Sequence, residues 1–114
     1  MTEAEIQKHL GDKIFKFELD IQNDKLTISL KELNAGKPLC YELSFTLEEI
    51  QKKNKMYNSC KSLEEVKEHL SHVFKEDSTN LKSLEDGKKI QINFKVFYIA
   101  KIVDENFILD IKSI

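Results

Sequence analysis

Two histidines, His69 and His72, lie three residues apart in a segment with helical periodicity, and Glu65 and Glu68 precede them by about one turn. Residues three or four positions apart share a face of a helix, so this spacing can place metal ligands side by side. The alternative is a solvated polar face opposite Leu70. An HxxH pair alone is a weak metal signal, so the sequence favours the polar face and predicts neither a metal nor a cofactor.

No other pattern in the chain carries catalytic chemistry. The sequence has no GxSxG segment and no glycine-rich phosphate loop. Its carboxylates alternate with lysines, whereas a catalytic acid and base need a cleft that raises the pKa of one of them. We therefore expect a protein that is not an enzyme.

The charges are balanced, with a formal net charge of −2, and all 18 basic residues are lysines. Arginine is the preferred side chain for reading phosphate and guanine, so its absence argues against specific nucleic-acid binding. No run approaches the ~18 apolar residues of a membrane-spanning helix, and the N-terminus lacks the apolar segment of a signal peptide. We expect a single domain over residues 1–114 that is intracellular, in the cytoplasm or on the cytoskeleton, without membrane contact.

The two cysteines, Cys40 and Cys60, lie outside any CxxC motif. A zinc or redox role therefore has little support. A disulfide between them and a role as small apolar fillers both stay open, and the second is favoured in a reducing compartment.

The elements that must position these residues begin with a short amphipathic segment. Thr2 and Glu5 have the spacing of a capping box, Ile6 and Leu10 are four positions apart, and Gly11 is suited to end a helix. These features predict a short N-terminal helix.

Alternating apolar residues then predict strands at 14–21, 26–33 and 39–45, the first two joined as a hairpin. The residues expected on the buried face are Phe15, Phe17, Leu19, Ile21, Leu26, Ile28, Leu30, Tyr41, Leu43 and Phe45.

The strand pattern returns after residue 78. It predicts strands at 79–85, 88–99 and 107–114. Asp86 and Gly87 form a strong tight-turn signal between the first two, and the segment 104–106 predicts a turn before the last.

The pentapeptides TLEEI and SLEEV predict two helix starts. In each, the first residue (Thr46 or Ser62) and the glutamate three positions later have the spacing of a capping box. They predict a helical hairpin over about residues 47–57 and 63–75. A phosphate at either start is disfavoured because the glutamates oppose it and no glycine-rich loop precedes it.

The resulting fold class is α+β, with an antiparallel sheet or small β-sandwich of about six strands. The helical hairpin is inserted between the third and fourth strands, and a short helix precedes the sheet. Tight turns between neighbouring strands make the sheet antiparallel.

The segment FKVFYIAKIV (94–103) is apolar on both faces of a strand. Phe97 and Ile99 lie on one face, and Phe94, Val96 and Tyr98 lie on the other. A strand that is apolar on both faces is usually covered. Either the helical hairpin covers Phe97 and Ile99, which we favour because the helices must dock somewhere, or a partner protein does. Phe97, Tyr98 and Ile99 are therefore the candidate protein interface.

The aromatic residues also support an alternative from another class. Phe94, Phe97, Tyr98 and Phe107 could stack on bases, as in some small sheet domains. The alternative function is thus a small accessory subunit of a nucleic-acid-processing complex, which the balanced charge opposes.

The arrangement YELSFTLEEIQKKNKMYNSCKSLEEVKEHL, followed by IQINFKVFYIAK and NFILDIK, resembles a poorly characterised small domain of ciliates and related protists. Its layout is also similar to the head domain of centriolar cartwheel proteins and DNA end-joining scaffolds. The resemblance covers about residues 14–112 and lies in capping and core positions. It implies a scaffold-like structural protein, a protein-binding subunit of a larger cytoskeletal, ciliary or other multiprotein complex.

Overall fold

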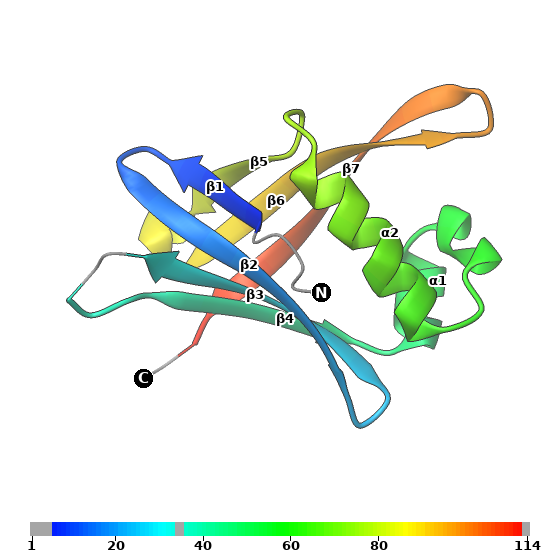
Figure 1. Ribbon diagram of the computed structural model, residues 1–114, viewed down its shortest axis with the longest axis horizontal. Helices are drawn as coiled ribbons and strands as arrows, with labels where there is room; N and C mark the ends of the chain where they lie inside the picture. Colours follow the sequence, from blue (N-terminus) through cyan, green and yellow to red (C-terminus); the bar gives the residue numbers. More distant parts are fainter. Residues whose placement is uncertain (1–5, 34–35, 113–114) are drawn as a thin grey trace, which may run out of the picture.

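The computed structural model describes residues 6–33 and 36–112, which form one curved antiparallel sheet with a helical insertion (Figure 1). The strands of this part of the chain are β1 (Ile6–Leu10), β2 (Lys13–Gln22), β3 (Lys25–Leu33), β4 (Cys40–Phe45), β5 (Asn80–Leu84), β6 (Lys89–Tyr98) and β7 (Lys101–Ile111). The helices are α1 (Leu47–Lys53), α2 (Leu63–Lys75) and two short 3₁₀ helices, η1 (Lys55–Ser59) and η2 (Glu85–Gly87).

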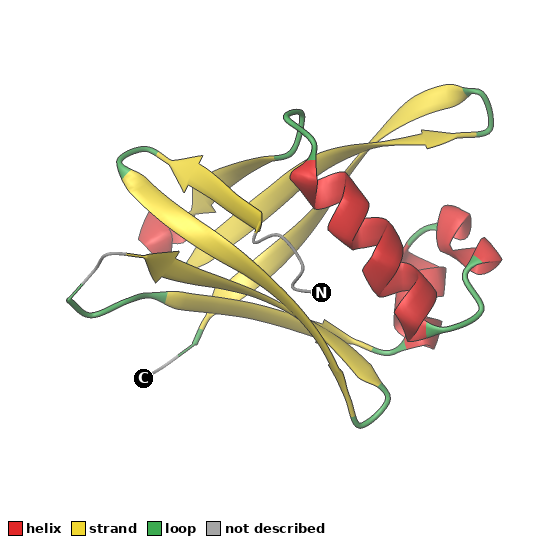
Figure 2. Ribbon diagram, in the orientation of Figure 1, coloured by secondary structure: helices red, strands yellow, loops and turns green. Residues whose placement is uncertain are grey.

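The sheet has the strand order β1-β2-β3-β4-β7-β6-β5, and every adjacent pair is antiparallel. Its two outer strands, β1 and β5, come into contact, so the sheet curls into a nearly closed barrel. Figure 2 shows α2 lying across the concave side of the sheet. Three hairpins precede the helical insertion and two follow it, and β7 returns to lie beside β4.

Aromatic side chains join the helices to the sheet. The Phe74 ring of α2 lies 5.1 Å from the ring of Phe17, 5.6 Å from that of Phe94 and 6.5 Å from that of Phe107. All four side chains are buried, and full burial of such a side chain contributes about 1.5–3 kcal/mol. The helical insertion is therefore fixed to the sheet through its core face.

Both predicted helix starts are confirmed. The Thr46 hydroxyl accepts the Glu49 N–H (3.2 Å), and the Glu49 carboxylate accepts the Thr46 N–H (2.9 Å). At the second start, the Ser62 hydroxyl accepts the Glu65 N–H at 3.3 Å. The predicted first helix is shorter than expected, because Asn54 adopts an extended conformation that ends α1 and caps η1.

The six-strand layout is wrong, because the described chain forms seven strands and the helices follow the fourth strand, not the third. The error begins with the predicted N-terminal helix, since Ile6–Leu10 is strand β1, paired with β2; residues 2–5 lie outside the described residues. Two residues four positions apart share a face in a strand as well as in a helix, so this spacing could not separate the two. Gly11 opens the tight turn into β2, with a φ of +63°.

The predicted turn at 104–106 is also wrong. These residues lie inside β7, where Asp104 pairs with Lys95 across the ladder. The turn falls at Ile99 and Ala100, so the chain forms one long β6–β7 hairpin. The prediction failed because the polar residues Asp104, Glu105 and Asn106 have the composition of a turn although they lie within a strand.

Candidate functional site

The turn of the β6–β7 hairpin has an unusual conformation for its residues. Tyr98 and Lys101 are paired, and the two residues between them, Ile99 and Ala100, have φ angles of +48° and +59°. This left-handed conformation suits glycine or asparagine, and it costs other residues about 1–2 kcal/mol each. A β-branched residue such as Ile99 is a genuine outlier there.

Three apolar side chains at this turn face solvent. Phe97 is 74%, Ile99 75% and Ile102 68% exposed. Phe97 and Ile102 are direct cross-strand partners, so their side chains lie next to each other on one face. We call Phe97, Ile99 and Ile102 the apolar tip; it lies at the end of the hairpin that projects past α2 in Figure 1.

The expectation that the helical hairpin covers Phe97 and Ile99 is wrong, because both are exposed. Tyr98, the third residue of the predicted interface, is half-buried and packs against the core. Ile102 was missed, because its pairing with Phe97 depends on the position of the turn.

Polar contacts anchor the base of the hairpin to the helical insertion. The Asn54 side-chain amide, between α1 and η1, donates a hydrogen bond to the Glu105 carboxylate of β7. The ammonium group of Lys53 lies 5.4 Å from the centre of the Phe107 ring. The hairpin is thus attached to the helical insertion at Glu105 and Phe107, and its part between Glu105 and the turn projects from the fold.

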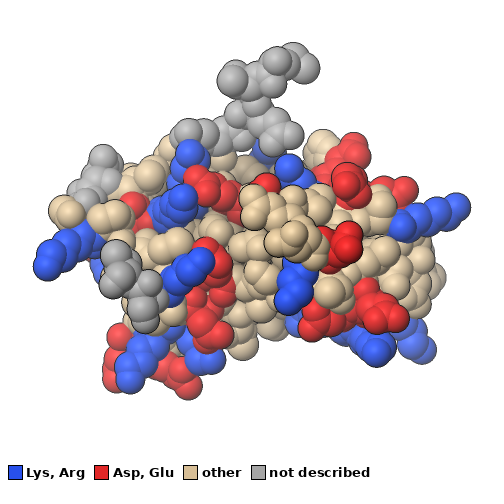
Figure 3. Space-filling view, turned by 90° about the horizontal axis from the view of Figure 1, so that it is seen from below, with Lys and Arg blue, Asp and Glu red and all other residues tan. Residues whose placement is uncertain are grey.

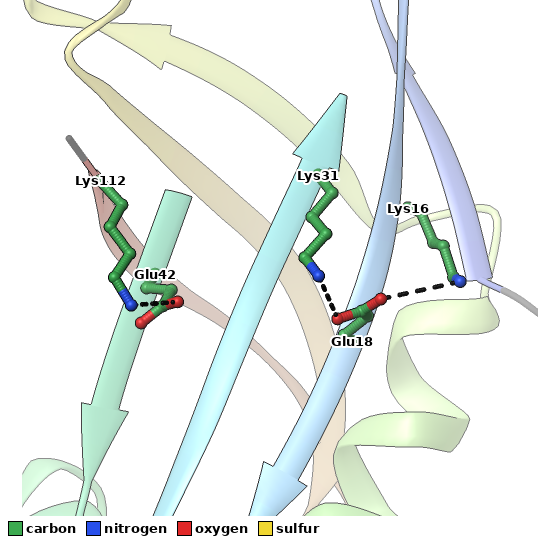
Figure 4. Close-up of polar contacts among 5 residues, drawn as sticks. All are labelled: Lys16, Glu18, Lys31, Glu42 and Lys112. Carbon is green, nitrogen blue, oxygen red and sulfur yellow. Dashed lines mark hydrogen bonds and ion pairs between the residues drawn. The ribbon is translucent and has the colours of Figure 1, made fainter. Parts of the chain in front are cut away.

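A groove opens where β4 and β7 separate. The two strands pair only at Tyr41 with Ile111 and Glu42 with Asp110. Lys112 reinforces this end, since its N–H donates to the Cys40 carbonyl (2.8 Å) and its ammonium group to the Glu42 carboxylate (2.9 Å; Figure 4). Beyond it lies a groove of about 310 Å³, lined by Leu43, Ser44, Phe45, Glu49, Ile50, Lys53, Asn106, Phe107 and Ile108.

The floor of this groove is apolar and its rim is polar. The rings of Phe45 and Phe107 are stacked at 5.7 Å with an interplanar angle of 11°, and Ile50 is buried beside them. Glu49 lies on the rim, and hydrogen bonds from Thr46 lower the pKa of its carboxyl group. The groove is suited to hold an apolar side chain.

The two histidines lie in different surroundings. His69 is half-buried, with its ring 6.1 Å from that of Tyr57, and burial and the nearby His72 lower the pKa of His69. His72 is exposed and lines a separate polar groove with Asp20. Within residues 6–33 and 36–112, no group of three or more potential ligands is suited to hold a metal ion.

The other residues singled out in the sequence lie inside the fold. Cys40 and Cys60 are free thiols, and burial raises the pKa of each. Phe94 and Phe107 are core residues, with rings stacked at 5.4 Å, so these two rings cannot stack on a base. Lysines and carboxylates are interleaved over the face shown in Figure 3.

Comparison of the chain with protein-family models, with curated proteins and with solved structures found no match. None of the described helices is both long enough and apolar enough to cross a membrane. The candidate site therefore rests on geometry: an apolar tip, a hairpin fixed at its base, and an apolar groove beside it.

Proposed function

We propose that this protein is a non-enzymatic interaction module, a subunit of a larger multiprotein assembly, and that its apolar tip is a main contact with a protein partner. The observation that carries this proposal is that two unfavourable features coincide at the tip. Ile99 is 75% exposed and has a φ of +48°.

Neither feature stabilises the isolated chain. An exposed isoleucine gains nothing from burial, and its left-handed backbone carries a conformational cost. Strained residues persist where the structure around them holds them, and they cluster at functional sites. Contact with a partner would bury these side chains, and burial would then contribute favourably.

The magnitude fits a binding anchor. Full burial of an apolar side chain contributes about 1.5–3 kcal/mol. The three side chains are 74%, 75% and 68% exposed, so covering what remains exposed contributes about 3–6 kcal/mol in all. Association costs free energy of similar size, so the tip needs further contacts around it. The groove between β4 and β7 and the nearby edge of β7 can supply them.

The cellular setting is proposed from the sequence resemblance. A cytoskeletal or ciliary complex, in the cytoplasm, is the expected location. The interaction surface does not depend on this location, so the two parts of the proposal are separate.

Proximity labelling in the source cell tests the function. The unsubstituted protein is compared with a Phe97→Ser, Ile102→Thr variant and with a matched surface variant, Lys82→Ser on β5. We expect a set of neighbours that the tip variant loses and the Lys82 variant keeps. An identical set of neighbours for all three proteins would contradict the proposal.

A further inference from the structure

The two sides of strand β7 differ in hydrogen bonding. The Ile111 N–H donates to the Lys88 carbonyl (2.9 Å) on the β6 side, and the Lys112 N–H donates to the Cys40 carbonyl (2.8 Å) on the β4 side. Backbone groups alternate in direction along a strand. The odd-numbered residues of β7 therefore bond to β6, and the even-numbered residues point toward β4.

Strand β4 pairs with β7 only at Ile111 and Asp110, near the C-terminal end of β7. Among the described residues, no strand pairs with this side of β7 from Ile102 to Ile108. The N–H and C=O groups of four residues consequently lack a strand partner: Ile102, Asp104, Asn106 and Ile108. We call this side of residues 102–108 the free edge.

The free edge differs from the two outer edges of the sheet. Strands β1 and β5 have five residues each, and they contact one another where the barrel nearly closes. Short and covered edges of this kind avoid pairing with other chains. The free edge belongs to an 11-residue strand, and Ile102 and Ile108 expose 68% and 42% of their surface.

The chemistry of the free edge is apolar at both ends and acidic in the middle. Asp104 and Glu105 lie at its centre. The Asp104 carboxylate lies 3.7 Å from the Lys95 ammonium group. The Glu105 carboxylate accepts a hydrogen bond from Asn54, and none of the ion pairs found among the described residues includes Glu105. At the Ile108 end, the apolar groove offers space for a side chain above the Phe45–Phe107 stack.

We propose that the free edge accepts an extended segment of a protein partner as an added strand, with a lysine or arginine opposite the acidic centre and an apolar side chain in the groove. This inference rests on the proposed function and names the kind of partner. Strand addition gains main-chain hydrogen bonds along the edge, and the side chains set the specificity.

A second copy of the chain fits this edge poorly. Antiparallel self-pairing centred on Glu105 would place two Glu105 carboxylates side by side, and centring on Asp104 would do the same with two Asp104 side chains. Centring on Asn106 would set each Asp104 opposite Ile108. Like charges directly opposite each other destabilise a strand pair, which favours a cationic partner.

The probe is a capped heptapeptide of the order isoleucine, valine, threonine, lysine, lysine, valine, isoleucine, which matches residues 102–108 in length. We expect the amide hydrogens of Asp104 and Asn106 to exchange at least about tenfold more slowly when it binds. The amides of Glu105 and Phe107, already bonded to β6, should change little. A peptide with glutamates for the lysines should bind at least about tenfold more weakly.

Two variants separate the edge from the tip. Asn106→Pro removes one free N–H without touching the β6 ladder, as proline is tolerated on edges, and should weaken peptide binding at least about tenfold. Ile99→Asn should leave it unchanged. If Asn106→Pro does not fold, the exchange pattern of the unsubstituted protein decides the question.

Three results would overturn the inference. They are no binding of the peptide at about 1 mM, which corresponds to about −4 kcal/mol; slowed exchange at odd and even residues alike; and a dimer whose even-numbered β7 amides are already slow without peptide. If the peptide does not bind but proximity labelling still finds neighbours that depend on the apolar tip, the added strand is rejected and the proposed function stands.

Discussion

Two hairpins of this protein turn with the same backbone geometry and opposite chemistry. Between β2 and β3, Asn23 and Asp24 have φ angles of +52° and +61°; between β6 and β7, Ile99 and Ala100 have φ angles of +48° and +59°. Asparagine and aspartate adopt this conformation readily, whereas isoleucine does not. The first turn is explained by local preference, and the second is not.

The residues next to the two turns differ in the same direction. The first cross-strand pair below the closing pair is Ile21 with Leu26 in one hairpin and Phe97 with Ile102 in the other. Leu26 is fully buried, whereas Ile102 is 68% exposed. The β2–β3 hairpin packs its apolar residue into the core of the protein. The β6–β7 hairpin exposes its apolar residues to solvent, as expected for a binding element.

The largest expected difference is between the stability effects of truncating Leu26 and Ile102, one residue from each hairpin. Leu26→Ala should lower the free energy of unfolding by about 2–5 kcal/mol, because it leaves a cavity in the core. Ile102→Ala should change it by less than about 0.5 kcal/mol, as is usual for an exposed side chain. Urea denaturation of both variants measures the difference, and comparable losses would mean that Ile102 packs in the folded chain.

Exchanging the turn residues gives the next effect. Asn23→Ile with Asp24→Ala should lower the free energy of unfolding by about 2 kcal/mol, because both new residues are strained in the left-handed region. The same denaturation experiment checks this. An unchanged stability would remove the argument that Ile99 and Ala100 are strained.

The reciprocal exchange should have a smaller effect of opposite sign. Ile99→Asn with Ala100→Gly should raise the free energy of unfolding by about 1 kcal/mol, because relief of strain is partly offset by the entropy of glycine in the unfolded chain. Chemical denaturation again provides the measurement. A loss of stability would show that Ile99 supports the fold and is not reserved for a partner.

Local signals in the sequence predicted local structure well. Thr46 with Glu49 specified a helix start because capping involves only residues of one turn. The separation of Ile6 from Leu10 could not distinguish helix from strand, and the choice was made by pairing with β2. Because a helix was predicted there, the predicted sheet had one strand too few. The helical insertion was therefore predicted after the third strand, whereas it follows the fourth.

The candidate site was predicted in part. Phe97 and Ile99 were identified because the segment is apolar on both faces. Ile102 was not, because its place beside Phe97 follows from a turn that lacks any turn-forming residue. The groove and the free edge depend on where β4 leaves β7, which is a long-range property of the sheet.

A photoreactive amino acid placed at position 99, and in a second protein at position 23, tests the central claim most directly. Both positions are exposed two-residue turns of the same geometry. After irradiation in the source cell, we predict a discrete crosslinked protein from position 99 and none from position 23. Crosslinks from neither position, or the same crosslinks from both, would contradict the assignment of the apolar tip as a binding surface.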